Sequence, residues 1–343
     1  MAAHRLFCNI QTLSEVIRLR KDRPYSSVYA VIEKLCDLYL EAIDTAQIKR
    51  LAAANPVIKK LLKRDNKRLY IINTIKEEIK SYRPDDIYLI SPPDSLQFED
   101  YRVSRGVMVI NSLSDMKYLE NICISHFRPF NLLTEKQKRK LRKQNEEFED
   151  INTWNDVFNT LKIEPINSAV IVDNYILEKF ERRSESLYNL IKAIVPDGLV
   201  IPFHLTIFVY NKNGEMNLKQ DKLEQVIEEI HNLKLGSKIK ISIIAHTRND
   251  LTHDRYIITN FHLINSGRGF GVIDSRGVKE NAQGDIKSTF YGIEYLTSSN
   301  SVKHQYSHIL EWLKEIYSDN SGVETDYFFE IGDEFDNRLL CEY

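Results

Sequence analysis

From residue 165 onward, short apolar runs alternate with longer amphipathic stretches, and this alternation constrains the fold more than any other feature of the chain. Residues 169–172, 203–210 and 239–245 are nearly continuous apolar runs, which are typical of strands buried on both faces. Residues 184–195 and 218–233 carry apolar side chains at three- and four-residue spacing, which predicts helices. Strands separated by helices indicate a largely parallel sheet with right-handed crossovers.

The pattern changes after the third apolar run. Residues 255–260 and 261–273 are strand-like with no helix between them, which predicts a hairpin or an antiparallel edge. Residues 301–317 then predict a closing helix. We therefore expect one α/β domain over residues 165–320 and a C-terminal tail over residues 321–343.

The first 150 residues predict a mainly helical region. Apolar side chains recur with helical spacing around residues 28–39 and 48–52, and residues 58–80 form a third amphipathic stretch. Only residues 87–90 and 107–110 are strand-like, so we expect two short strands here. The pattern changes character near residues 145–165, which predicts the domain boundary.

Charge and cysteine content exclude several classes of protein. The net charge of −2 over 343 residues provides no global attraction to nucleic acid or to an anionic membrane. The four cysteines are scattered and form no CxxC pair, so neither a zinc site nor a disulfide framework is predicted. No apolar run is long enough to span a bilayer. We expect a cytoplasmic protein with no metal, no cofactor and no transmembrane contact.

The segment from Thr252 to Asn260 carries the most informative motif. In this segment one residue separates His253 from Arg255, and four residues separate Arg255 from Asn260. In a strand, His253 and Arg255 would project from the same side of the sheet. An imidazole beside a fixed cation is an arrangement that can engage a phosphate group.

This spacing resembles the HxKxxxxD signature of the phospholipase D superfamily, with Arg255 for Lys and Asn260 for Asp. The first strand ends in Asp173-Asn174-Tyr175, and a glycine-rich loop from Ser266 to Gly271 contains Arg268. In these features the chain is similar to the phospholipase D-like C-terminal domain of ESCRT-associated MIT-domain proteins. The resemblance implies a mixed sheet flanked by helices, and it covers under half of the chain.

The resemblance also implies a chemistry. Active members place two motifs face to face, and a histidine forms a phosphohistidine without a metal. This chain has one motif, so a complete site would need a homodimer or a second chain. An amide at position 260 cannot carry the negative charge of the acid. The related ESCRT-associated domains look like binding modules.

Three interpretations of His253 and Arg255 stay open: structural hydrogen bonding, noncatalytic anion contact and catalysis. Arg268 could contribute to anion binding, although a tight turn explains its glycine neighbours well. A basic run could bind a polyanion or form a solvated, internally salt-bridged helix with the acidic turn that follows it. It consists of Lys136, Lys138, Arg139, Lys140, Arg142 and Lys143.

The preferred hypothesis is a noncatalytic protein that recognises phosphate or a polyanion, with His253, Arg255 and Arg268 as the anion-binding residues. We expect a protein partner or a homodimer, with nucleic acid as the first polyanion and an acidic membrane surface as the second. The setting could be a prokaryotic defence-type complex. The alternative is a metal-independent phosphodiesterase or nuclease, assembled as a homodimer around His253, Arg255 and Asn260.

Overall fold

The computed structural model describes most of the chain as two compact units. It describes all residues except 1–3, 23–24, 35, 42–43, 64–67, 79–82, 84–85, 90–98, 111–129, 149, 162–165, 175, 178–179, 212–219, 248–254, 261, 267–268, 275–276, 280–286, 292–299, 321–328, 334–335 and 342–343. The first unit takes residues 1–126 and 292–307, and the second takes residues 127–291 and 308–343.

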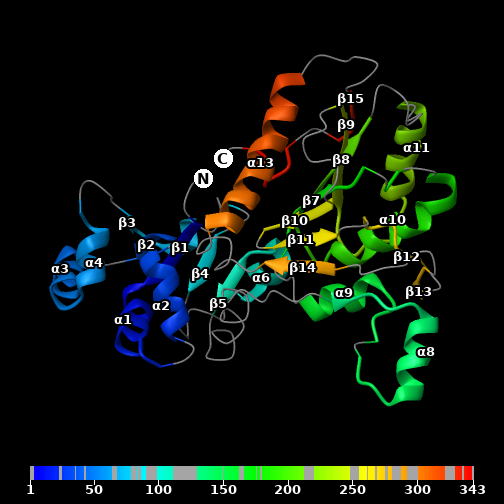
Figure 1. The fold of residues 1–343 in the computed structure, drawn as a ribbon. Coiled ribbons are helices and arrows are strands. Elements are labelled where there is room, and N and C mark those ends of the chain that lie inside the picture. Colours follow the sequence, from blue (N-terminus) through cyan, green and yellow to red (C-terminus); the bar gives the residue numbers. More distant parts are fainter. Residues whose placement is uncertain are drawn as a thin grey trace. The chain divides into compact units, whose positions relative to one another are not determined.

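The first unit contains a parallel sheet with strand order β3-β2-β1-β4-β5 (Figure 1). Its elements are β1 (His4–Asn9), α1 (Ile10–Arg18), α2 (Tyr25–Lys34), β2 (Cys36–Glu41), α3 (Thr45–Ala54), α4 (Pro56–Leu61), β3 (Leu69–Ile72), α5 (Ile75–Glu78), β4 (Ile87–Leu89), α6 (Glu99–Arg105) and β5 (Met108–Ile110). The strand order reverses next to β1, as in doubly wound α/β sheets.

This sheet corrects the prediction of a mainly helical N-terminal region with two short strands. Strands β1, β2 and β3 were missed, and β3 interrupts the predicted helix over residues 58–80. Side chains along β2 alternate between buried and partly exposed, which is the period of a strand. Because α2 ends only two residues before β2 begins, the apolar residues of both elements had combined into one helix-like pattern.

The second unit contains an eight-stranded mixed sheet with order β15-β9-β8-β7-β10-β11-β14-β6. Its elements are β6 (Phe130–Asn131), α8 (Glu135–Gln144), α9 (Trp154–Leu161), β7 (Ser168–Val172), α10 (Phe180–Ile194), β8 (Phe203–Tyr210), α11 (Gln220–His231), β9 (Ile239–His246), β10 (Arg255–Thr259), β11 (Leu263–Ser266), β12 (Ile273–Asp274), β13 (Gly277–Val278), β14 (Lys287–Tyr291), α13 (Asn300–Asn320) and β15 (Phe329–Gly332). Residues 300–307 of α13 belong to the first unit.

Pairing in this sheet agrees with the predicted alternation. Strands β7, β8 and β9 are parallel, whereas β10 runs antiparallel to both β7 and β11. The chain is therefore a mixed α/β protein, and the hairpin predicted after residue 255 is present.

Helices cover both faces of the central strands. Ile241, Ile243 and Ala245 of β9 join one core cluster with the apolar side of α11. On the opposite face, the His246 ring lies 5.5 Å from Trp312 of α13 and perpendicular to it. Figure 1 shows α10 and α11 on one side of β8 and β9, and α13 on the other.

The predicted C-terminal tail is part of the second unit. Strand β15 pairs with β9, and residues 336–338 contact the amino ends of β7 and β8. The unit boundary falls at residues 126–127 instead of 145–165, because β6 pairs with β14. Strands β15 and β6 and the C-terminal residues contact strands that are distant in sequence. The periodicity of a short segment carries no information on such contacts.

Candidate anion site at the carboxyl end of β7

Asp173 follows β7 directly and anchors the glycine-rich loop. Its buried carboxylate accepts a hydrogen bond from the backbone N–H of Phe270, at 2.7 Å. The preceding Gly269 has φ +87, and a Cβ there would lie 2.8 Å from Asp173 Oδ2. Only glycine combines this backbone conformation with so close an approach, so the loop is fixed against the end of β7.

Lys279 fixes the far side of the same loop. Its ammonium group donates to the carbonyl oxygen of Gly271 at 2.8 Å and to Ser186 Oγ on α10 at 2.7 Å. Lys279 remains partly exposed. A cation therefore stands at the loop.

Arg255 begins β10 beside these groups. Tyr256 pairs with Val172, so the same register places Arg255 opposite Asp173. Both positions lie on the side of the sheet that carries Ile171 and Ile257, because strand side chains alternate. Arg255 is partly exposed. We call the group formed by Asp173, Arg255, Gly269–Gly271 and Lys279 the β7-edge site.

Neighbouring strand ends are also polar. The backbone N–H of Tyr210 donates to Asn174 Oδ1 at 3.2 Å, and the backbone N–H of Asn211 donates to the carbonyl oxygen of His246 at 2.6 Å. Carboxyl ends of parallel strands meet at one edge, which is where open α/β sheets bind ligands.

The structure brings together only part of the predicted site. His253 and Arg268 lie outside the described residues, so Arg255 is the one predicted anion-binding residue that the structure places. Asp173 was noted in sequence as the end of a strand without an assigned role. Lys279 was missed, since an isolated lysine in a loop carries no sequence signal.

Asn260 lies at the opposite end of β10 from Arg255. Its Oδ1 accepts the backbone N–H groups of Asn167 at 3.0 Å and Ser168 at 3.2 Å, and its Nδ2 donates to Asn167 Oδ1 at 3.0 Å. Five residues of strand separate it from Arg255 by roughly 16 Å. Asn260 therefore ties β10 to the amino end of β7.

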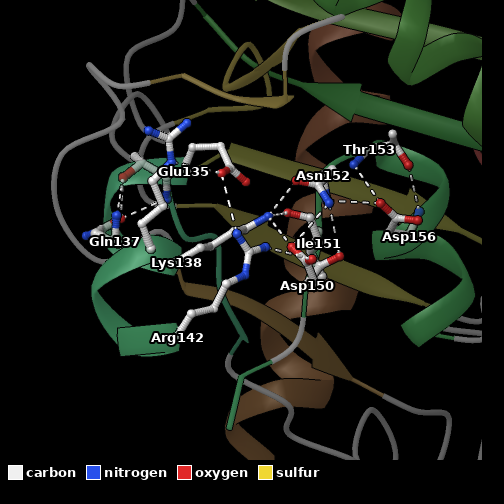
Figure 2. Close-up of polar contacts among 11 residues, drawn as sticks. Glu135, Gln137, Lys138, Arg142, Asp150, Ile151, Asn152, Thr153 and Asp156 are labelled. Atoms are coloured by element: carbon white, nitrogen blue, oxygen red, sulfur yellow. Dashed lines mark hydrogen bonds and ion pairs between the residues drawn. The ribbon is translucent and has the colours of Figure 1, made fainter. Parts of the chain in front are cut away.

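Part of the predicted basic patch on α8 contacts polar groups of the same unit, as Figure 2 shows. Lys138 is 1% exposed, and its ammonium group contacts the Ile151 carbonyl oxygen at 2.7 Å, Asn152 Oδ1 at 2.6 Å and Asp150 Oδ1 at 2.8 Å. Its hydrogen bond to Lys138 lowers the pKa of Asp150. Lys138 thus belongs to the interior and is removed from the predicted patch.

Other members of the patch also have acidic partners. Arg142 lies 3.1 Å from Asp150 and 3.7 Å from Glu135, and Arg139 lies 3.8 Å from the same Glu135. Lys136, Lys140 and Lys143 are exposed. Internal pairing therefore reduces the positive field of α8.

Among the described residues, no group of three or more histidine, cysteine, aspartate or glutamate side chains is placed to hold a metal ion. In the same part of the chain, every helix is too short or too polar to cross a bilayer. The sequence matches no protein-family model and no curated protein.

Proposed function

We propose that this protein recognises a phosphate-bearing polyanion without cleaving it, and that its second unit is a degenerate phospholipase D-like domain. The supporting observation is the position of Arg255 at the carboxyl end of β7, beside the loop held by Asp173 and Lys279. Two cationic side chains and a fixed glycine turn gather at the edge where α/β sheets bind ligands. His253 precedes Arg255 by two residues and is proposed to complete the site.

The charge at this edge favours recognition over catalysis. Asp173 stands opposite Arg255 and offsets part of its positive charge, so the site suits a weakly held phosphate more than a developing transition-state charge. Asn260 stands where the family has an acid, and its amide, which is hydrogen-bonded to Asn167, carries no negative charge. The chain carries a single motif, whereas active family members use two, which also favours recognition over catalysis.

We propose nucleic acid as the polyanion. A chain with net charge −2 needs local contacts to approach phosphates, and a site with few cations gives modest affinity and a shallow salt dependence. A DNA- or RNA-binding subunit with a protein partner or a second copy would supplement this affinity through avidity.

The test is binding of fluorescently labelled single-stranded DNA and RNA and duplex DNA, measured by anisotropy in EDTA over a range of salt concentrations. Arg255→Ala should weaken binding about tenfold, because it removes a charge-assisted phosphate contact. It should also reduce the slope of log affinity against log salt by about one. Lys192→Ala is the matched control, since Lys192 is an exposed cation on α10 away from the loop.

Equal losses of nucleic-acid affinity in Arg255→Ala and Lys192→Ala would reject the β7-edge site as the binding site. Binding to acidic vesicles with no binding to nucleic acid would reject the proposed ligand. Cleavage of the labelled strands in EDTA that disappears in His253→Ala would establish the phosphodiesterase instead.

A further inference from the structure

A groove of about 580 Å³ runs between α11 and β15, at the edge of the mixed sheet away from β10. Glu224, Ile227, Glu228 and His231 line its helix wall, and these positions follow one face of α11. Residues 330–333 line the opposite wall. The groove therefore has a helix along one side and a strand along the other.

Strand β15 ends the sheet in the described part of the chain. Ile331 pairs with Ile243, and the backbone N–H of Asp333 donates to the Ile241 carbonyl oxygen at 2.8 Å. Backbone groups of an antiparallel strand alternate in direction, so Glu330 and Gly332 direct theirs away from β9. Such an edge is a template for another strand.

The end of the groove is fixed by Gly332 and Asp333. Gly332 has φ +123, and a Cβ there would lie 2.3 Å from the Ile241 carbonyl oxygen. The Asp333 carboxylate accepts the backbone N–H of Ile241 at 2.8 Å and lies 3.2 Å from His231 Nε2. This bracing gives the groove a fixed end.

Charge and spacing indicate what fits the groove. Glu224 and Glu228 are exposed carboxylates on the helix wall, and His231 is the one side chain of the described lining that can carry positive charge. Residues four apart on a helix are separated by about 6 Å along its axis. Side chains two apart on a strand are separated by about 6.7 Å, so alternate lysines of an added strand would match both carboxylates.

We propose that this groove binds an extended segment of a partner protein as an added strand on β15, with lysine or arginine at alternate positions facing α11. Backbone hydrogen bonds to residues 330 and 332 hold the segment, and Glu224 and Glu228 select its charge. The groove is independent of the β7-edge site, so the two proposals fail separately.

The test uses the full-length protein and a fluorescein-labelled peptide with the repeat Lys-Val-Lys-Val-Lys-Val, followed by anisotropy. A peptide of the same composition ordered Lys-Lys-Lys-Val-Val-Val should bind at least tenfold more weakly. The double variant Glu224→Lys with Glu228→Lys should weaken binding of the alternating peptide at least tenfold. The matched control is Glu185→Lys with Glu311→Lys, which changes the net charge equally at exposed positions elsewhere.

Backbone N-methylation separates strand addition from simple charge attraction. Methyl groups at the alternate residues of one peptide edge should abolish binding, whereas methyl groups at the other edge should leave it intact. Equal binding of both methylated peptides, or equal binding of the two sequence orders, would overturn the proposal. An equal loss in the control double variant would overturn the assignment of the groove.

Discussion

The two ends of β7, β8 and β9 are built from similar polar residues, but the chain uses them differently. At the amino end, polar side chains from distant segments hydrogen-bond one another and the strand backbones. At the carboxyl end, cationic side chains gather around a glycine turn and remain partly exposed. The contrast shows that polar side chains at the end of a strand do not by themselves form a binding site.

The amino end is closed by the C-terminal segment. Asn337 Nδ2 donates to the Ala169 carbonyl oxygen at 3.1 Å and to Thr206 Oγ1 at 3.0 Å. Arg338 donates to the carbonyl oxygen of Pro202 at 2.9 Å. His204 Nδ1 contacts the Asp336 carbonyl oxygen at 2.8 Å. The side chains of Asn337, Arg338 and His204 are thus bonded within the protein.

The largest expected effect is at this closed end. Asn337→Ala should lower the free energy of unfolding by about 3 kcal/mol, because it removes buried hydrogen bonds to two strands at once. Urea unfolding followed by circular dichroism measures the change. Asn232→Ala, at an exposed position, should stay within about 0.5 kcal/mol of the parent protein. Similar values for both variants would show that the C-terminal segment does not close the sheet.

The two ends of β10 give the sharpest contrast within one motif. Asn260→Ala should lower the free energy of unfolding by about 2 kcal/mol, since it leaves buried backbone N–H groups of Asn167 and Ser168 without an acceptor. Nucleic-acid binding by the folded variant should not change. Arg255→Ala should show the reverse pattern, with weaker binding and less than about 1 kcal/mol of lost stability.

An acid at position 260 provides a further check on that contrast. Asn260→Asp keeps the acceptor for the two backbone N–H groups but places a carboxylate against Asn167 Oδ1. It should create no phosphodiesterase activity, because the chain carries one motif and the family's chemistry uses two histidines from two motifs. Activity gained in Asn260→Asp would mean that the missing acid, and not the site geometry, prevents catalysis.

Strands β8 and β9 of the second unit were predictable from sequence because they are long. Strands β8 and β9 have eight residues each, and their apolar runs and the helices between them are unambiguous. In the first unit, β1 and β2 have six residues each and β3 has four, and α1 begins directly after β1. A helix-like period is judged over 11 to 18 residues, so a short strand between helices is absorbed into their pattern.

For the candidate site, the sequence could indicate which residues share a strand but not which residues contact them. The spacing of His253 and Arg255 is local, so the sequence could indicate that both face one side of a strand. Asp173 lies 97 positions from its loop partner Phe270, and Lys279 lies only 8 positions from Gly271 but belongs to no motif. The same limit applies to Asn260, whose partners lie more than ninety positions away.

Acid should destabilise the amino end. Burial lowers the pKa of His262 to about 3, and burial together with Arg338 lowers the pKa of His204 to about 4. The folded protein therefore keeps both rings neutral, whereas the unfolded chain binds protons below the usual value of 6.5. The free energy of unfolding should fall from pH 6.5 towards pH 4 by about 1.4 kcal/mol per pH unit for each histidine.

Urea unfolding at pH 7.5, 6 and 5 measures this slope. In His262→Gln, the slope between pH 6 and pH 5 should be shallower by about 1.4 kcal/mol, even if the variant is less stable at pH 7.5. A slope unchanged from the parent protein would show that His262 is not held neutral by burial.

A smaller loss of stability than in Asn337→Ala is expected in the glycine turn at the carboxyl end. Gly269→Ala should cost about 1 to 2 kcal/mol, because of its positive φ and the contact with Asp173, and should weaken nucleic-acid binding by displacing that carboxylate. Gly271→Ala should cost less than about 0.5 kcal/mol, since no atom lies within 4 Å of the added Cβ. If Gly269→Ala lost stability but bound nucleic acid normally, the turn would be structural, and the two strand ends would differ only in exposure.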